Sequence, residues 1–548
     1  MKGQRPISPT VSAQYVRDGL WPNTTLLDFF DEAVKKAPSK TAIVAPGGVR
    51  LTYKELAEAV DVTARGLKAA GLGPGDILSI QLPNCAEVAI LHVAATKLGA
   101  VTIPLLPNYR ANELAYILGF AKTKVAIIPQ SYRRFDYPEM YQQIWPALPD
   151  LGNIFVLGGN GAGAMRPYRD LLAIGRESST ALPSVVATGD DLTTLIFTSG
   201  TESKPKGVMH SHNTTLHGTI QMGRLLGLGS DDVVWVPSPV GHGTGFQWGI
   251  RQAITLGSTM VLQDLWDVEE ALRLIEAERC SFVLSATPFV AMLLESPSLD
   301  RRDLSSFRIF ACAGAPIPRA LGEKARSKIG CTLIGMWGMS ECFVGSASPP
   351  DAPVEKLWET DGRAVAGAEL AIFDETRTRR LAPGEIGELA TRGPHVALGY
   401  FNDPERTAST FSDEGWLFSN DVATIDTEGY IRLGGRKKDI INRGGLKVST
   451  REIEEFLLQH PAILSVAVVP MKDDRLGEKG CACVVLREGM KIDLPTITKF
   501  LETRGLAKYK MPEYIALMDE LPMTPSGKVQ KFRLEQGLSD KTIGVSTN

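Results

Sequence analysis

The sequence contains few cysteines and no long apolar run, and both absences narrow the class of protein. The seven cysteines of the 548-residue chain are scattered, with no Cys-x-x-Cys pair. An odd number of thiols without metal-binding spacing argues against a disulfide framework and fits a reducing cytoplasm. The most apolar stretch, residues 86–107, carries Glu87, His92 and Lys97, so it is too polar to span a membrane. The N-terminus also lacks the apolar segment of a secretory signal.

The chain shows no excess of charge of either sign. Lys and Arg number 59 against 62 Asp and Glu, which gives a net charge of −3. This balance provides no general attraction for nucleic acid or an anionic membrane. Hydrophobic residues make up 44% and charged residues 22%, values that exclude disordered, collagen-like and coiled-coil proteins. The length predicts three or four domain-sized units of about 150 residues.

Helical and strand-like patterns alternate through most of the chain. Residues 53–70 have apolar positions at helical spacing, 77–82 form a short apolar run, 87–98 are helical again and 101–105 strand-like. Such alternation predicts βαβ units around a mostly parallel sheet. Short strands and turns over 367–431 indicate a β-rich unit. After a boundary near 434–439, a helix over 450–459 and strands over 465–470 and 482–486 indicate a small α+β domain.

The most informative stretch is a polar loop that follows an apolar run. Residues 195–207 read Leu-Ile-Phe-Thr-Ser-Gly-Thr-Glu-Ser-Lys-Pro-Lys-Gly. Hydroxyl and backbone N–H groups are donors for a phosphate chain, lysine supplies compensating charge, and glycine lets the backbone approach closely. The loop is not a Walker motif, because Pro205 stands where that motif requires glycine. On composition alone a polar surface turn is the better interpretation, so a phosphate site needs support from other motifs.

Further motifs follow in a fixed order and supply that support. They are Ala-Gly-Ala-Pro at 313–316, Gly-Met-Trp-Gly-Met-Ser-Glu at 335–341, Ser-Asn-Asp at 419–421, Gly-Arg-Lys-Lys-Asp at 435–439, Gly-Gly at 444–445 with Glu-Ile-Glu at 452–454, and Pro-Ser-Gly-Lys at 525–528. With the polar loop they resemble the motifs of adenylate-forming enzymes: acyl-CoA synthetases, carrier-protein adenylation domains and luciferases. The resemblance covers about residues 25–535. Within that family the sequence is most similar to ligases for cyclohexanecarboxylate and for short- to medium-chain fatty acids.

The resemblance implies a fold and a two-step reaction. The fold is α/β: a large N-terminal domain of doubly wound βαβ subdomains plus a β-rich subdomain (residues 1–437), then a small mobile α+β domain (438–548) that carries a lysine loop. In the first step a carboxylic acid and ATP give acyl-AMP and pyrophosphate; in the second, coenzyme A gives acyl-CoA and AMP. A carboxylate is a poor electrophile, and attaching AMP converts one oxygen into a good leaving group, with electrostatic help at the phosphates. The implied ligands are ATP, Mg²⁺ and coenzyme A as a substrate, and the partner is a small carboxylic acid.

The resemblance also assigns roles to individual residues. Glu341 is the expected Mg²⁺ ligand and Ser340, where the family usually has Thr, the donor to the α-phosphate; Asp421 has a carboxylate able to accept from two ribose hydroxyls. Lys528 would bridge the attacking carboxylate and the α-phosphate. Its acylation by a lysine acyltransferase, reversed by a deacylase, would block adenylation and spare transfer from preformed acyl-AMP. The remaining ATP contacts would come from Thr198, Ser199, Gly200, Thr201, Lys206, Gly314, Ala315 and Arg436.

The second step requires the small domain to turn about a hinge at Lys438. Gly444 and Gly445 would then let the pantetheine arm pass, because residues without a Cβ leave room. In the phosphate loop, Glu202 and Ser203 replace the Thr-Gly common in the family. The Glu202 carboxylate would repel a polyphosphate, so we expect it to point away or toward the metal.

The acid pocket is the least defined part of the site. His242 lies between glycines and matches a pocket-edge histidine of the family, although a single histidine is as often merely packed. Trp337 and Met339 either line the pocket or fill the core. Gly338 stands where acetate-specific relatives have Trp, so it predicts room for a larger acyl group, and Gly338→Trp is expected to impair bulky acids while sparing acetate. His210 and His212 have no third ligand at a recognisable spacing, which favours packing over a metal site.

Three alternatives remain open on sequence. An enzyme that loads a carrier protein would make acyl-AMP but no acyl-CoA, and a luciferase-type oxidation would consume O₂. A nicotinamide-dependent oxidoreductase is suggested by Gly-x-Gly-x-x-Ala at residues 159–164, after a strand-like run. Pro167 interrupts the helix which that motif requires, and no acidic residue follows for a ribose.

Overall fold

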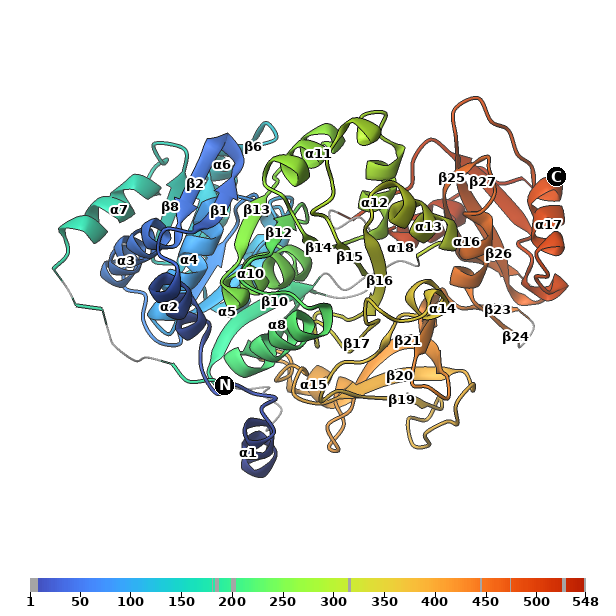
Figure 1. Ribbon diagram of the computed structural model, residues 1–548, viewed down its shortest axis with the longest axis horizontal. Coiled ribbons are helices and arrows are strands. Elements are labelled where there is room, and N and C mark those ends of the chain that lie inside the picture. The colour runs from blue at the N-terminus through green and yellow to red at the C-terminus, as the bar shows by residue number, and fades with distance from the viewer. Residues whose placement is uncertain are drawn as a thin grey trace.

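The computed structural model describes residues 8–179, 181–182, 187–198, 204–313, 317–443, 446–473, 475–524 and 529–546. The chain runs through two large sheets, a smaller antiparallel sheet and a C-terminal unit at one end of the molecule (Figure 1). Among the described helices, none combines the length and the apolar composition of a membrane span.

The first large sheet has seven strands in the order β11-β10-β4-β3-β5-β8-β9. All neighbours are parallel except β10 and β11, which form an antiparallel hairpin at one edge. The predicted strands over 77–82 and 101–105 are confirmed as β3 and β4. The strands are β3 Ile77–Ile80, β4 Val101–Pro104, β5 Val125–Pro129, β8 Asn153–Leu157, β9 Arg166–Pro167, β10 Leu192–Thr198 and β11 Lys206–Ser211.

The second large sheet has nine strands in the order β18-β17-β16-β15-β14-β12-β13-β1-β2. Its six central strands are parallel, and β2, β17 and β18 join antiparallel at the edges. The strands are β1 Thr41–Ala45, β2 Val49–Thr52, β12 Val233–Val236, β13 Thr259–Leu262, β14 Phe282–Ser285, β15 Ile309–Ala313, β16 Thr332–Trp337, β17 Ser346–Ala347 and β18 Arg363–Ala364. The predicted parallel, doubly wound architecture is confirmed.

Helices cover both sheets, and one of them lies between the sheets (Figure 1). Helix α4 (Ala86–Lys97) contacts β1 of the nine-stranded sheet and β3 and β4 of the seven-stranded sheet. A helix enclosed on both sides has no polar face, which explains the apolar composition of residues 86–97. The predicted helix over 53–70 is confirmed as α3. The other helices of this part are α1 Pro9–Arg17, α2 Leu26–Lys36, α3 Tyr53–Ala69, α5 Ala111–Ala121, α6 Tyr137–Ile144, α7 Tyr168–Glu177, α8 His212–Leu226, α10 Gln252–Leu256, α11 Val268–Ala277, α12 Thr287–Glu295, α13 Arg319–Lys328, α14 Val354–Trp358 and α15 Pro404–Thr410.

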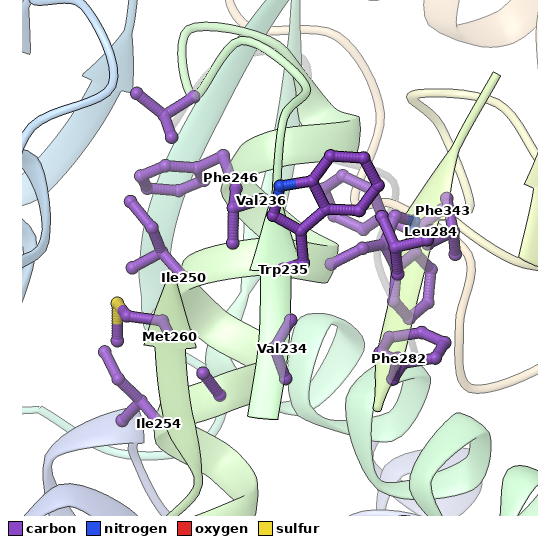
Figure 2. Packing of buried hydrophobic residues seen from close by; sticks show 14 of the residues in the cluster. Val234, Trp235, Val236, Phe246, Ile250, Ile254, Met260, Phe282, Leu284 and Phe343 are labelled. Carbon is purple, nitrogen blue, oxygen red and sulfur yellow. The ribbon is translucent and has the colours of Figure 1, made fainter. Parts of the chain in front are cut away.

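The core of the nine-stranded sheet is packed by a helix that follows His242. A short turn, α9 (Gly243–Gly245), continues as a π-helix over Phe246–Arg251 and then as α10. Figure 2 shows Phe246, Ile250 and Ile254 along one side of β12 and β13, facing the apolar side chains of those strands. A Cβ at Gly249 would lie 2.5 Å from a methyl of Val236, so this glycine lets the helix approach the sheet closely.

The expected β-rich unit is confirmed as a four-stranded antiparallel sheet, β19-β20-β21-β22. Its strands are β19 Glu369–Phe373, β20 Gly387–Arg392, β21 Leu417–Ile425 and β22 Ile431–Arg436. In the last hairpin Asp421 pairs directly with Arg436. The two residues expected at the ribose therefore lie side by side.

The C-terminal part has its own sheet and its own apolar clusters, as predicted for a small α+β unit. A single 3-10 turn, Lys437–Asp439, connects β22 to β23. Helix α16 begins at Thr450, and its cap Ser449 accepts a hydrogen bond from the Glu452 backbone N–H. The remaining elements are β23 Ile441–Arg443, β24 Leu446–Val448, β25 Ile463–Asp473, β26 Gly477–Leu486, β27 Tyr514–Met518, α16 Thr450–Leu457, α17 Leu494–Thr503 and α18 Lys531–Ser539.

The Gly-x-Gly-x-x-Ala stretch at 159–164 does not open a helix. It forms the loop between β8 and β9, where Gly161 and Gly163 have φ values of 79° and 61°. Helix α7 begins only at Tyr168. The dinucleotide interpretation requires a helix directly after the first glycines, so the structure removes its main support.

Candidate active site

The predicted phosphate site lies at the turn of the β10–β11 hairpin. Thr198 ends β10 and Lys206 begins β11, and the two residues pair across the hairpin. Among the described residues, no hydrogen-bond partner meets the buried Thr198 Oγ1. The antiparallel pairing therefore places a hydroxyl and an ammonium group at the base of the same loop. The loop residues Ser199, Gly200, Thr201, Glu202 and Ser203 lie outside the described residues.

Lys206 reaches the expected metal ligand, Glu341. The Lys206 ammonium donates to Glu341 Oε1 at 2.5 Å and to the Tyr400 hydroxyl at 2.8 Å. The Tyr400 hydroxyl donates to the same Oε1 at 2.7 Å. Burial alone would raise the pKa of Glu341, but the charge and hydrogen bond of Lys206, with the Tyr400 hydroxyl, lower it overall. Glu341 is therefore an ionised carboxylate in a buried position.

Glu341 fits a magnesium ion that is shared with phosphates. Among the described residues, no cluster of three or more His, Cys, Asp or Glu side chains is placed to hold a metal on its own. Mg²⁺ is commonly held by one or two carboxylates together with phosphate oxygens rather than by a complete protein cage. A single buried carboxylate beside the predicted phosphate loop matches that donor set.

The backbone before Glu341 is fixed by a buried histidine that the sequence did not single out for this role. Burial lowers the pKa of His210 to about 4, so the ring is neutral at pH 7. Its Nε2–H donates to the Ser340 carbonyl oxygen at 2.7 Å, and its Nδ1 lies 3.1 Å from the Thr214 hydroxyl. The ring also stacks on Phe343 with centroids 4.3 Å apart. His210 thus orients the segment that carries Ser340 and Glu341.

The expected ribose site contains a third residue. The Arg436 guanidinium lies 2.7 Å from Asp421 Oδ1, and the Trp337 indole N–H donates to Asp421 Oδ2 at 2.8 Å. Trp337 was expected either to line the acid pocket or to fill the core. It is buried in the core cluster, and its indole N–H in addition holds the carboxylate that is expected at the ribose. The bond joins residues 84 positions apart, so no local spacing in the sequence signals it.

The predicted hinge region is anchored on the side of the large domain. Lys437 donates to Glu388 Oε2 at 2.6 Å, and Arg377 donates to both oxygens of Glu388 at 2.8 Å. The Glu388 side chain is fully buried. The predicted hinge residue Lys438 lies in the 3-10 turn directly after this anchor. Its side chain is not among those described, and Gly444 and Gly445 lie outside the described residues.

The predicted acid-pocket loop is brought against the segment after Glu341. A Cβ at Gly243 would lie 3.2 Å from the ring of Phe343, so the His242 loop and the Glu341 segment are neighbours. His242 Nδ1 accepts from the Thr244 backbone N–H at 3.1 Å and thereby caps α9. Its capping role is shown, and its position at the pocket edge stays a prediction. Met339 packs, partly buried, against the large core cluster.

The structure gives a reason for glycine at position 338 that differs from the expected one. A Cβ at this position would lie 1.9 Å from the backbone oxygen of Phe343. The glycine therefore allows the chain to turn back on itself between 338 and 343. Gly338→Trp would distort this turn as well as fill space, so a loss of activity in this variant would not by itself report the length of the pocket. The room for a larger acyl group stays a prediction.

Three other predicted residues lie in parts of the chain that the structure does not describe. Gly314 and Ala315, expected at the adenine, and Lys528, expected at the α-phosphate, lie outside the described residues. The residues that sequence reasoning missed are Tyr400, Glu388 and the ordering role of His210; each acts through a contact between segments distant in the chain.

Comparisons with known proteins show the family to which the chain belongs. A family model described as AMP-binding enzyme matches residues 30–401, and one described as AMP-binding enzyme C-terminal domain matches residues 452–528. The chain belongs to the AMP-binding enzyme family. The predicted class, an AMP-forming acyl-CoA synthetase, is confirmed.

Two curated relatives illustrate the range of acids within the family. A medium-chain fatty-acid–CoA ligase of Escherichia coli (strain K12) is 37% identical over 530 residues, which are 96% of this chain and 92% of the relative. A 2,3-dihydroxybenzoate-AMP ligase of Bacillus subtilis (strain 168) is 30% identical and covers 99% of both chains.

Solved structures support the same architecture. ATP-bound MatB from Rhodopseudomonas palustris superposes with a TM-score of 0.85 at 27% identity, over 95% of this chain and 99% of MatB. The anthranilate CoA ligase AuaEII in complex with anthranoyl-AMP gives a TM-score of 0.87 at 25% identity, over 95% and 98%. ATP binding is supported by the first of these likenesses.

Proposed function

We propose that the protein joins an apolar acid, medium-chain or alicyclic such as cyclohexanecarboxylate, to coenzyme A through an acyl-AMP intermediate. The observation that carries this proposal is the apolar, buried segment after Glu341, the proposed metal ligand. Phe343 and Val344 come two and three residues after Glu341 and are buried. A Cβ at Gly218 would lie 3.5 Å from the Trp248 ring and 3.7 Å from a methyl of Val344, so both side chains border this glycine. We infer that this apolar segment borders the acyl group, which suits an acid without charge. The 37% identity to a medium-chain fatty-acid–CoA ligase supports the same substrate class.

Each site residue is proposed to have a separate role in the first step, the formation of acyl-AMP. Lys206 would bind the β- and γ-phosphate oxygens, and Ser340 would donate to the α-phosphate. Asp421, oriented by Arg436 and Trp337, would accept from the ribose hydroxyls. Mg²⁺, held by Glu341, would offset the charge that develops on the departing pyrophosphate.

The second step is proposed to use the same site after the small domain turns. We place the boundary between residues 437 and 438, with Lys438 as hinge, Lys528 serving adenylation, and Gly444 and Gly445 lining the passage for coenzyme A. The anchoring of Lys437 to Glu388 supports this boundary, because it fixes the chain up to the proposed pivot.

All seven cysteines are free, which fits a reducing cytoplasm.

A second candidate function is adenylation for a carrier protein. It is favoured by the 30% identity to an aryl acid–AMP ligase over 99% of both chains. The two candidates differ in the acceptor thiol and in the shape of the acid, so one assay separates them.

The test is pyrophosphate release from a panel of acids, measured with and without free coenzyme A. We expect hexanoate, octanoate and cyclohexanecarboxylate to be used better than acetate or 2,3-dihydroxybenzoate, and acyl-CoA to form. Acyl-AMP without acyl-CoA would support the carrier-loading function instead. Preference for an aryl acid with formation of its CoA thioester would overturn the proposed acid class.

A further inference from the structure

Tyr400 lies on a segment that joins the two halves of the proposed phosphate site. The Phe401 backbone N–H donates to the Gly207 carbonyl at 2.8 Å, one residue after Lys206. The Ala397 backbone N–H donates to the Glu341 carbonyl at 2.8 Å. Residues 397–401 therefore bridge β11 and the Glu341 segment, and Tyr400 is held between Lys206 and Glu341 by the backbone.

The Tyr400 hydroxyl completes a triangle with the two charged groups. It donates to Glu341 Oε1 at 2.7 Å and accepts from Lys206 Nζ at 2.8 Å. The Lys206 ammonium also lies 4.6 Å from the centroid of the Tyr400 ring. The Tyr400 side chain is fully buried, whereas Lys206 keeps 26% of its side chain exposed. A tyrosine hydroxyl carries its proton at neutral pH, so Tyr400 can donate to Glu341.

Both donors converge on Oε1 of Glu341, and Oε2 carries neither of these hydrogen bonds. A polyphosphate would compete with Glu341 for the ammonium of Lys206, the exposed member of the triangle. The buried Tyr400 hydroxyl is neutral and is not drawn away. It can hold Oε1 while Oε2 faces a cation, and this restraint limits the rotamers of a carboxylate whose charge is costly to bury.

We propose, resting on the proposed function, that Tyr400 is a positioning residue that orients Glu341 toward the metal of the ATP–Mg²⁺ complex when Lys206 turns to the phosphates. Tyr400 does not touch the reacting atoms. Its effect is on metal affinity and not on the transfer of the acyl group to coenzyme A.

The test is Tyr400→Phe, which removes the hydroxyl and keeps the ring. We expect the half-saturating Mg²⁺ concentration for pyrophosphate release to rise about tenfold, because a hydrogen bond to a charged group is lost. Mn²⁺ binding with a non-hydrolysable ATP analogue, followed by electron paramagnetic resonance, is expected to weaken by a similar factor. The rate of thioester formation from preformed acyl-AMP and coenzyme A is expected to stay unchanged, since that step uses no polyphosphate.

The matched control is Tyr141→Phe. Tyr141 is also fully buried, and its hydroxyl donates to Gln81 Oε1 at 3.0 Å. The control variant is expected to lose thermal stability as Tyr400→Phe does, with unchanged Mg²⁺ and Mn²⁺ dependence. An unchanged metal dependence in folded Tyr400→Phe, or an equal loss of thioester formation, would overturn the proposal.

A second variant, Thr407→Val, tests the proposal if Tyr400→Phe does not fold. The Thr407 hydroxyl accepts from the Tyr400 backbone N–H at 3.0 Å, so Thr407→Val loosens the same side chain. It must then raise the half-saturating metal concentration, and an unchanged value would count against Tyr400. The Mn²⁺ measurement needs no acid, so it tests Tyr400 even if the wild-type enzyme activates none of the proposed acids.

Discussion

At the scale of single residues, the site depends on a few buried charges that are each held by one or two donors. Glu341 depends on Lys206 and Tyr400, and Asp421 depends on Arg436 and Trp337. In a buried environment such contacts are worth more than the same contacts at the surface, and removing one leaves a charge poorly compensated. Substitution of a donor residue should therefore impair substrate or metal binding even though the carboxylate itself is unchanged.

Trp337→Phe tests this at the proposed ribose site. The variant removes the indole N–H that donates to Asp421, so the KM for ATP is expected to rise about tenfold with little change in the KM for the acid. Trp358→Phe is the control, because that buried indole donates to the Leu333 carbonyl at 3.2 Å. Steady-state kinetics decide the outcome. A rise in the KM for the acid alone would place Trp337 in the acid pocket instead.

At the scale of elements, helix α16 of the small domain is held against the large domain by an ion pair. The Arg451 guanidinium donates to Asp361 Oδ1 at 2.8 Å, and Asp361 Oδ2 accepts from the Leu433 backbone N–H at 2.9 Å. The side chains of Arg451 and Asp361 are only 14% and 9% exposed. The proposed rotation of the small domain about residue 438 would break this pair, whereas the anchor of Lys437 on Glu388 lies before the proposed pivot and would persist.

Arg451→Met is expected to shift the balance between the two domain orientations. The substitution keeps the apolar stem and removes the charge, which leaves Asp361 buried without its partner. We expect the ratio of adenylation to thioester formation, each measured as a half-reaction, to change at least about fivefold.

The control for this change is Arg487→Met. Arg487 pairs with Glu295 at 3.0 Å, and the two side chains are 45% and 43% exposed. An exposed pair contributes at most about 1 kcal/mol, so the ratio should stay close to that of the wild type. Equal effects of the two variants would show that the buried pair is not what holds this orientation.

At the scale of the whole molecule, the large domain buries several neutral histidines. Burial lowers the pKa of His210 and His217 to about 4 and that of His212 to about 3, and the pKa of His92 is also lowered. The unfolded chain takes up these protons near pH 6.5, and the folded chain does so only at lower pH. Stability is therefore full above about pH 6.5 and is lost as the pH falls toward 4.

This pH dependence is measurable by urea unfolding between pH 7.5 and 5. Each such histidine is expected to remove up to about 1.4 kcal/mol from the free energy of unfolding per pH unit in this window. His217→Gln should reduce the slope, and His460→Gln, at a less buried position, should change it less. A free energy of unfolding that does not vary between pH 7 and 5 would contradict the account.

The sequence by itself determined the class of fold and the order of the site motifs. Apolar periodicity predicted α3, β3, α4 and β4, because helix and strand periods follow from local backbone geometry. The polar loop after β10 and the segment after β16 were predicted as site residues, because both follow apolar strands and match known motifs in order. These are properties of neighbouring residues, which a linear chain displays directly.

Only the tertiary structure decided which of those residues touch. Lys206 and Glu341 are 135 positions apart and Glu341 and Tyr400 59, and nothing in their spacing relates them. Their contact arises because the strand pairing and the bridging segment 397–401 bring three distant pieces of chain together. The same holds for Trp337 with Asp421 and for Gly338, whose reason is the nearby carbonyl of Phe343. Long-range contacts and close backbone approaches depend on how sheets and loops pack, which the order of residues along the chain does not show.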